Sequence, residues 1–215
     1  MPLPASVLQA WRYTSTSTDS TVVLPDGCRD LILHVVPGQR PQWLLTALAD
    51  TFYDVPGTVG ECFWGFRLQP GAQFDDARLM RAVQAGPLHD AQDALPLLDA
   101  CVRLDPRVVD ALHSLSVSTT VATAARQLGV SERTLQRLVQ AATGRHPAYW
   151  KCLARVRRAT AGLSHAPSLV ACAADHGFSD QAHMTREFQR WWGRTPSAVL
   201  ASAGLLAVAT ASGYP

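Results

Sequence analysis

The 215-residue chain lacks several features that would place it in a membrane or a secretory pathway. No apolar run approaches the ~20 residues that a membrane span needs, and the start has neither the cationic nor the long apolar segment of a secretory signal. Its five cysteines are scattered, odd in number and never form a Cys-x-x-Cys pair, which favours a reducing compartment. We therefore expect a cytoplasmic protein without membrane contact, and the sequence indicates no cofactor.

Acidic residues are scarce in the second half of the chain. From Ser116 onward, eleven Lys and Arg residues accompany four Asp and Glu residues, a net charge of +7. Residues 1–115 contain eight basic and thirteen acidic residues, a net charge of −5, so the overall value of +2 hides a basic half. This asymmetry indicates a polyanion as the partner of the C-terminal half, although a solvated helical surface would have the same composition.

The basic half contains one pattern twice, with an offset of 48 residues that becomes 49 after one inserted residue. The first set pairs Val121, Ala124, Ala125, Gly129, Val130 and Ser131 with Leu169, Cys172, Ala173, Gly177, Phe178 and Ser179. The second set pairs Leu135, Arg137, Val139, Gly144, Arg145 and Pro147 with Met184, Arg186, Phe188, Gly193, Arg194 and Pro196. Each copy predicts a short helix, a glycine turn and a second helix.

The residue types suit a tight helix-turn-helix. An apolar stripe at i, i+3, i+4 and i+7 marks the first helix of copy one: Val121, Ala124, Ala125 and Leu128. Gly129 and Gly177 supply the left-handed backbone that such a turn commonly requires.

After each turn glycine come an apolar residue and a serine. We expect Val130 and Phe178 to be buried as apolar plugs. Ser131 and Ser179 stand where an N-cap oxygen is needed, so they are the predicted caps of the two second helices.

The N-terminal half predicts a different architecture. Its β-rich runs, separated by proline and glycine turns, are 21–24, 31–36, 43–48 and 59–68. Helical patterns follow at 76–85, 91–103 and 106–115, and Asp105-Pro106 is a favourable helix start. The predicted fold class is α+β: a small β-rich N-terminal domain, a helical connector and an all-α C-terminal domain of two helix-turn-helix modules joined by a helix. The expected limits are 1–74 for the β-rich sensory domain, 75–117 for the connector, 118–200 for the double module and 201–215 for an apolar tail.

Four motifs follow one another in the repeat. They are Leu-Gly-Val-Ser-Glu-Arg-Thr-Leu-Gln-Arg at 128–137, Arg-Val-Arg-Arg-Ala at 155–159, Gly-Phe-Ser-Asp-Gln-Ala-His-Met-Thr-Arg-Glu-Phe at 177–188 and Gly-Arg-Thr-Pro at 193–196. With these motifs, roughly 80 residues resemble the C-terminal DNA-binding domain of AraC/XylS-type transcription regulators. Val139, Gly162 and Met184 depart from that family's usual residues.

The first half shows a weaker resemblance, through residues 24–32 and 65–71, to the short β-rich N-terminal domains of some members of this family. Those domains are regarded as sensory. The resemblance therefore implies a regulatory role without identifying a ligand.

The resemblance also implies which side chains read DNA. Arg133, Gln136 and Arg137 fall where the family's base-reading residues lie. On the second recognition helix, the corresponding face carries Gln181, Ala182, His183 and Arg186. Arginine can pair with guanine, glutamine with adenine and an alanine methyl with thymine. Two such helices in one chain must enter successive major grooves, about 34 Å apart.

Other polar residues of the repeat are better suited to phosphate contacts, which fix register without reading sequence. These candidates are Arg145, Lys151, Ser179, Arg194 and Thr195. On the connecting helix, the side chains of Arg155, Arg157 and Arg158 face phosphate or make internal ion pairs, and the sequence leaves both readings open.

We expect a sequence-specific transcription regulator that reads two adjacent half-sites, is modulated through its N-terminal domain and is not an enzyme. Its expected partner is double-stranded DNA, and RNA polymerase, a small-molecule effector and a second copy of the chain are further candidates. The alternative is a cysteine-based DNA repair or alkyl-acceptor enzyme with a DNA-binding tail, whose thiol would be Cys28.

The N-terminal half contains two sets of residues, one that could hold a metal and one that could line an effector pocket. Cys28, His34 and Cys62 would hold a metal only if their strands were neighbours. The alternative, in which these residues bind no metal, is favoured. The aromatic residues Trp43, Phe63, Trp64 and Phe66, with Phe52 nearby, either line an apolar effector pocket or simply pack in the core.

Overall fold

The computed structural model describes residues 2–85 and 90–215. Contacts between backbone positions divide it into two compact units. Unit 1 comprises Met1–Thr21, Cys28–Leu48 and Asp54–Pro106, and unit 2 comprises Val22–Gly27, Ala49–Tyr53 and Arg107–Pro215. Strands precede helices in the described chain, which confirms the α+β class. The part of the expected connector around Pro87 lies outside the described residues.

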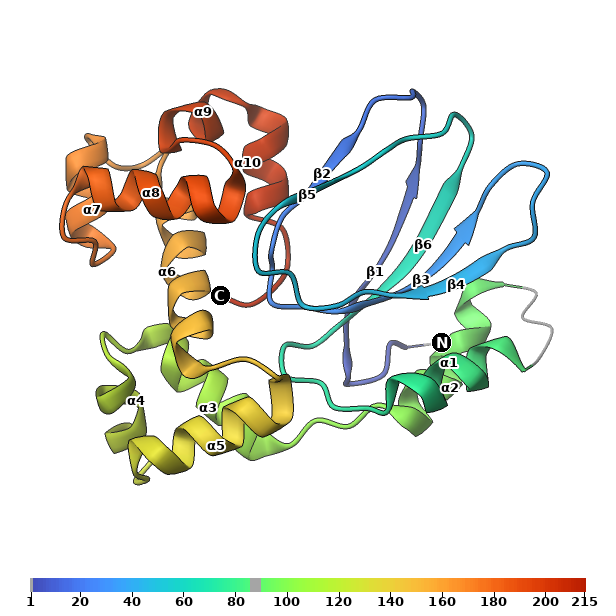
Figure 1. The fold of residues 1–215 in the computed structure, drawn as a ribbon, viewed down its shortest axis with the longest axis horizontal. Coiled ribbons are helices and arrows are strands. Elements are labelled where there is room, and N and C mark those ends of the chain that lie inside the picture. The colour runs from blue at the N-terminus through green and yellow to red at the C-terminus, as the bar shows by residue number, and fades with distance from the viewer. Residues whose placement is uncertain (1, 86–89) are drawn as a thin grey trace. The chain divides into compact units, whose positions relative to one another are not determined.

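Unit 1 is built on an antiparallel sheet with the strand order β1-β6-β3-β4 (Figure 1). The strands are β1 (Val7–Thr14), β6 (Cys62–Leu68), β3 (Asp30–Val35) and β4 (Gln42–Leu45). A separate pair joins β2 (Thr21–Val23) to β5 (Tyr53–Val55). The sequence did not indicate β1, because this edge strand leaves most of its side chains exposed and so lacks the alternation of a half-buried strand.

One face of the large sheet carries the core of unit 1. Alternate residues of β3 and β6, including Leu31, Leu33, Phe66 and Leu68, pack against helices α1 (Asp76–Gln84) and α2 (Leu95–Cys101). The helical pattern expected over 91–103 forms two elements, because a 3-10 turn, η1 (Ala91–Ala94), precedes α2. Pro96 lies in the first turn of α2, where its missing amide costs no helical hydrogen bond.

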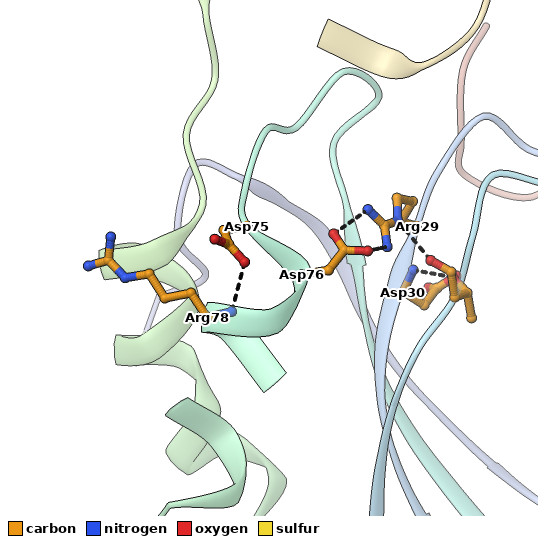
Figure 2. A network of polar contacts seen from close by, with 6 residues as sticks. Arg29, Asp30, Asp75, Asp76 and Arg78 are labelled. Atoms are coloured by element: carbon orange, nitrogen blue, oxygen red, sulfur yellow. Dashed lines mark hydrogen bonds and ion pairs between the residues drawn. The ribbon is translucent and has the colours of Figure 1, made fainter. Parts of the chain in front are cut away.

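A polar network fixes the start of α1 against the sheet (Figure 2). The guanidinium of Arg29 donates to both carboxylate oxygens of Asp76 at 2.9 and 2.7 Å, and its Nε donates to the carbonyl oxygen of Thr46 at 2.8 Å. Hydrogen bonding from Arg29 lowers the pKa of Asp76. Asp75 caps the helix by accepting from the backbone amide of Arg78. A bidentate ion pair between Arg29 and Asp76 therefore attaches the start of α1 to the sheet.

Unit 2 is helical apart from its short inserted segments. Its helices are α3 (Pro106–Val117), α4 (Val121–Gln127), α5 (Glu132–Thr143), α6 (Pro147–Gly162), α7 (Leu169–Asp175), α8 (Gln181–Trp192), α9 (Pro196–Ala201) and α10 (Ala203–Ala209). Figure 1 shows α6 running between α5 and α8, and both of these helices contact it. Among the described residues, no helix combines the length and the apolar character needed to cross a membrane.

The apolar tail packs on unit 2 through two buried residues, Ala209 and Tyr214. It forms α10 and ends with Tyr214, which is buried. The hydroxyl of Tyr214 donates to the carbonyl oxygen of Leu112 at 2.7 Å, and its ring meets Trp150 edge-on at 4.9 Å between centroids. Its backbone amide donates to Asp26, so the early segment Val22–Gly27 is held in the same unit.

Candidate nucleic-acid interface

The first module folds as its residue types predict. Thr120 caps α4 by accepting from the amide of Thr123, and Ser131 caps α5 by accepting from Thr134 at 3.1 Å. Between the helices Gly129 has φ +67°, the left-handed conformation expected of the turn. Ala124 and Ala125 are fully buried, which confirms the small-residue stripe.

The second module differs at the cap. Ser168 caps α7 by accepting from the amide of Ala171, and Gly177 has φ +72°. The N-cap of α8 is Asp180 and not Ser179, because the inserted residue moves the helix start by one position. Asp180 accepts from the amide of His183 at 2.6 Å, and this hydrogen bond lowers the pKa of the Asp180 carboxyl.

The apolar plugs also differ. Phe178 is buried as expected, at 6% exposure, and the guanidinium of Arg155 lies 4.7 Å from its ring centroid. The expectation for Val130 is wrong, because its side chain is 38% exposed. In the second module the phenylalanine ring carries an arginine on its face.

The cations of α6 are engaged inside unit 2. Arg155 pairs with Glu187 at 3.8 Å and donates to Gly177. Arg157 is buried and donates to Ala211 at 2.5 Å. The guanidinium of Arg158 donates to the carbonyl oxygen of Ser116. The sequence left open whether these arginines face phosphate or make internal contacts, and the structure shows internal contacts for all three. Part of the positive charge of this half therefore stabilises the fold.

The side chain of His176 explains why position 162 is glycine. A Cβ at Gly162 would lie 2.5 Å from Nε2 of His176. The imidazole therefore occupies the space that a larger residue on α6 would need. Burial, followed by the nearby Arg158, lowers the pKa of His176, while Asp175 acts in the opposite direction.

The predicted base-reading residues lie on α5 and α8. Those of α5 are exposed: Arg133, Gln136 and Arg137. On α8, Gln181, Ala182 and Arg186 are exposed and His183 is half-buried. Buried residues on the opposite faces, such as Val139 and Phe188, attach both helices to the module cores. Each recognition helix therefore presents a polar, cationic face to solvent.

His183 has a defined hydrogen-bonding state. Its Nδ1 lies 3.3 Å from the backbone nitrogen of Ser179 and 3.1 Å from that serine's hydroxyl. A backbone N–H can only donate, so Nδ1 accepts, and the neutral ring carries its proton on Nε2. Nε2 of such a ring is a hydrogen-bond donor. It matches guanine O6 or N7, adenine N7 or thymine O4, and it does not match an amino group.

The predicted phosphate-contact residues are in varied surroundings. The Nζ of Lys151 donates to the carbonyl oxygens of Ser118 and Thr119, and burial lowers its pKa. Arg145 pairs with Asp50 at 2.9 Å. Arg194 is exposed, and Thr195 caps α9 by accepting from Ala198. Ser179 holds His183, as described above.

The aromatic residues of unit 1 lie on both faces of its sheet. Phe66, Trp64 and Trp43 belong to the core face. Phe63 lies on the opposite face, where its ring stacks on His34 at 4.3 Å between centroids. A cavity of about 350 Å³ is lined by Trp64 and Phe66 together with residues of β1 and η1.

Two of the polar N-terminal candidates lie on neighbouring strands, since β3 carries His34 and β6 carries Cys62. Cys28 is buried, and His34 donates to or accepts from Glu61 at 2.8 Å. Cys62 lies near Thr14 and Gly60. Within residues 2–85 and 90–215, no group of three or more His, Cys, Asp or Glu side chains is arranged to hold a metal ion.

The helix-turn-helix region of the chain is similar to known proteins. Residues 124–202 match the model of a family described as "Helix-turn-helix domain". The chain is similar to a solved transcriptional regulator of Chromobacterium violaceum, described as an AraC-type DNA-binding domain-containing protein, with 25% identity over 45% of this chain and 90% of that one and a TM-score of 0.40. It is also similar to the DNA-binding domain of the global transcriptional factor AdpA, solved with a target DNA, with 29% identity over 45% of this chain and 87% of that one and a TM-score of 0.37. No curated protein matches the chain.

Two capped helix-turn-helix modules joined by one helix define a DNA-binding domain. Residues 124–202 form a domain of the helix-turn-helix class.

Proposed function

We propose that this protein is a sequence-specific transcription regulator that reads two adjacent half-sites in successive major grooves. The observation that supports this most strongly is the pair of 12-residue helices, α5 and α8, each with a buried apolar face and an exposed polar face. A major groove about 12 Å wide accepts one such helix. The helices differ in sequence, so the two half-sites need not be identical.

In this proposal Arg133, Gln136 and Arg137 read the first half-site. Gln181, Ala182, His183 and Arg186 read the second. The side chains of Arg133, Arg137 and Arg186 are exposed on the recognition helices, which supports a role toward an external ligand. Contacts to phosphate would come from Arg194, Thr195, Arg145, Ser179 and Lys151, and the last three would first have to exchange the internal contacts described above.

Selection of bound DNA from a random pool by the full-length protein tests the proposal. We expect enrichment of a bipartite site whose two elements lie about one helical turn, roughly 34 Å, apart. Absence of any enrichment at moderate ionic strength would contradict sequence-specific binding. Enrichment of a single undivided element would contradict the use of both modules.

We further propose that residues 1–74 form the sensory domain, 75–117 the connector and 118–200 the DNA-binding domain, with 201–215 as its tail. The cavity beside Trp64 and Phe66 is of a size that accepts a small apolar effector. Binding of such an effector would change the DNA affinity of the whole chain. A titration of small apolar compounds followed by intrinsic tryptophan fluorescence tests this, with Trp64→Phe as the variant that should lose the response. RNA polymerase and a second copy of the chain are the other proposed partners.

The competing function is a cysteine-based alkyl acceptor with a DNA-binding tail. Cys28 is only 5% exposed. An acceptor thiol must meet a bulky alkylated base, so this burial favours the regulator. Thiol labelling of the native protein separates the two, since an alkyl acceptor would show rapid modification of Cys28 near neutral pH.

A further inference from the structure

Consecutive residues between β4 and β5 contact both helix-turn-helix modules within unit 2. The carbonyl oxygen of Ala49 accepts from the hydroxyl of Tyr149 on α6 at 2.8 Å. The carboxylate of Asp50 pairs with Arg145, which follows α5, at 2.9 Å. The hydroxyl of Thr51 donates to the carbonyl oxygen of Arg190, near the end of α8, at 2.8 Å.

The next residue makes an apolar contact. Phe52 lies directly against Gly193, where a Cβ would stand 2.4 Å from Cζ of the ring. Gly193 has φ +64° and ends α8 in the left-handed conformation. Glycine therefore serves twice at this position, since it allows the helix to end and allows the ring to approach the backbone.

These contacts bridge a gap between the modules. A cavity of about 410 Å³ is lined by residues from the end of α5, such as Gln140, and from the end of α8, such as Trp191. Asp50 and Tyr149 also line this cavity. The two helix ends are therefore not fully packed on each other here, and the segment 49–52 connects them across the open space.

We propose that Ala49–Phe52 is a brace that fixes the spacing between the two recognition helices, and therefore the spacing of the half-sites that the protein accepts. This inference rests on the proposed function. Without the brace, α8 and α5 would be related mainly through α6. One base pair is about 3.4 Å of DNA length, so a small displacement between the helices changes which spacing fits.

The brace is also continuous with the N-terminal strands. It follows β4 by a few residues and leads directly into β5. A ligand that rearranged those strands would move the brace through the chain itself. The brace residues thus act as positioning residues for DNA reading without contact to a base.

The test measures spacing preference in the full-length protein. Half-sites recovered by selection are joined by spacers that are one or two base pairs shorter or longer than the selected one. Wild type should reject a one-base-pair change by about tenfold or more, because a misplaced half-site loses its base contacts. The variant Asp50→Ala/Thr51→Val/Phe52→Ala should bind several spacings with affinities within about threefold and should bind an isolated half-site as wild type does.

Matched control substitutions and a milder variant make the outcome decisive. Thr18→Val/Asp54→Ala removes a hydroxyl and a carboxylate from exposed positions outside the brace and should retain the wild-type profile. If the triple variant unfolds, Thr51→Val alone, which removes one exposed hydroxyl, should still widen the profile. An unchanged spacing profile in a folded brace variant would overturn the brace, whereas wild type with no bipartite preference would overturn the proposed function itself.

Discussion

The two helix-turn-helix modules share a pattern but differ in how each is stabilised. In the first, Ser131 caps the recognition helix and Val130 is exposed. In the second, an inserted residue transfers the cap to Asp180, and Phe178 is buried beneath Arg155. The insertion also leaves Ser179 available to hold His183. The second module therefore has two side-chain contacts, Arg155 to Phe178 and Ser179 to His183, at its turn and helix start.

The largest expected difference is in the stability lost when the apolar plug of each module, Phe178 or Val130, is replaced by alanine. Phe178→Ala should destabilise the protein by about 3 kcal/mol or more, because it opens a cavity and removes the support of Arg155. Val130→Ala should change the free energy of unfolding by no more than about 0.5 kcal/mol, as is usual for an exposed position. Urea unfolding of both variants measures the contrast. Equal losses would show that the burial of the two plugs is not the relevant difference.

The next difference concerns the matched arginines. Arg137→Ala and Arg186→Ala should each remove about 1–3 kcal/mol of discrimination, and each should relax the base preference in a different half-site. Arg40→Ala, which removes an exposed charge in unit 1, is the control. Competition binding with selected and random DNA provides the measurement. Equal weakening on both DNAs would reassign these arginines to phosphate contacts.

Substitution of the cap residues should show that Asp180, and not the repeat-aligned Ser179, caps the second recognition helix. Ser131→Ala should cost about 1 kcal/mol of stability, and Asp180→Ala should also destabilise, whereas Ser179→Ala should leave the helix start intact. Ser179→Ala should instead weaken the base preference at one position of the second half-site, because Nδ1 of His183 loses its contact with the Ser179 hydroxyl and keeps only the backbone amide at 3.3 Å. Thermal unfolding and repeated DNA selection report on these two effects separately. A stability loss in Ser179→Ala equal to that of Asp180→Ala would contradict the cap assignment.

The smallest difference is in pH dependence. Position 176 is histidine, while the repeat-related position 128 is leucine. Because burial lowers the pKa of His176, the folded state binds fewer protons at this site than the unfolded state. Its contribution to stability is fully present above pH 6.5, the ordinary value for histidine, and is lost as the pH falls through the lower pKa of the folded state.

His176→Leu should therefore flatten the decline of thermal stability between about pH 7 and pH 5. His165→Gln, at an exposed position, should leave the slope as in wild type. The midpoint of thermal unfolding across this range is the measurement. A steeper decline in His176→Leu would mean that the ring stabilises the fold in its charged form.

Much of the C-terminal domain was predictable because its signals are local. The stripe around Ala124, the left-handed Gly129 and the cap at Ser131 each depend on residues within a few positions. These predictions are confirmed. The cap in the second copy failed for an equally local reason, because the insertion was placed on the wrong side of Ser179.

The less accurate predictions concern elements whose stability depends on distant contacts. β1 is an edge strand with mostly exposed residues, so its pattern carried little signal. The helical pattern over 91–103 forms two elements, because α2 begins only at Leu95, after the 3-10 turn. Of the aromatic residues, Phe63 lies on the opposite face to Trp64 because neighbours along a strand point to opposite sides.

The sequence by itself determined the repeat, the turns, the cap at Ser131 and the polar faces of α5 and α8, since short-range backbone preferences and helical periodicity define them. Only the tertiary structure decided that Arg155, Arg157 and Arg158 are used internally, that Tyr214 completes the core of unit 2 and that residues 49–52 join the two modules. Those contacts bring together residues that are far apart in the chain, and no local periodicity records which of the many polar side chains will meet.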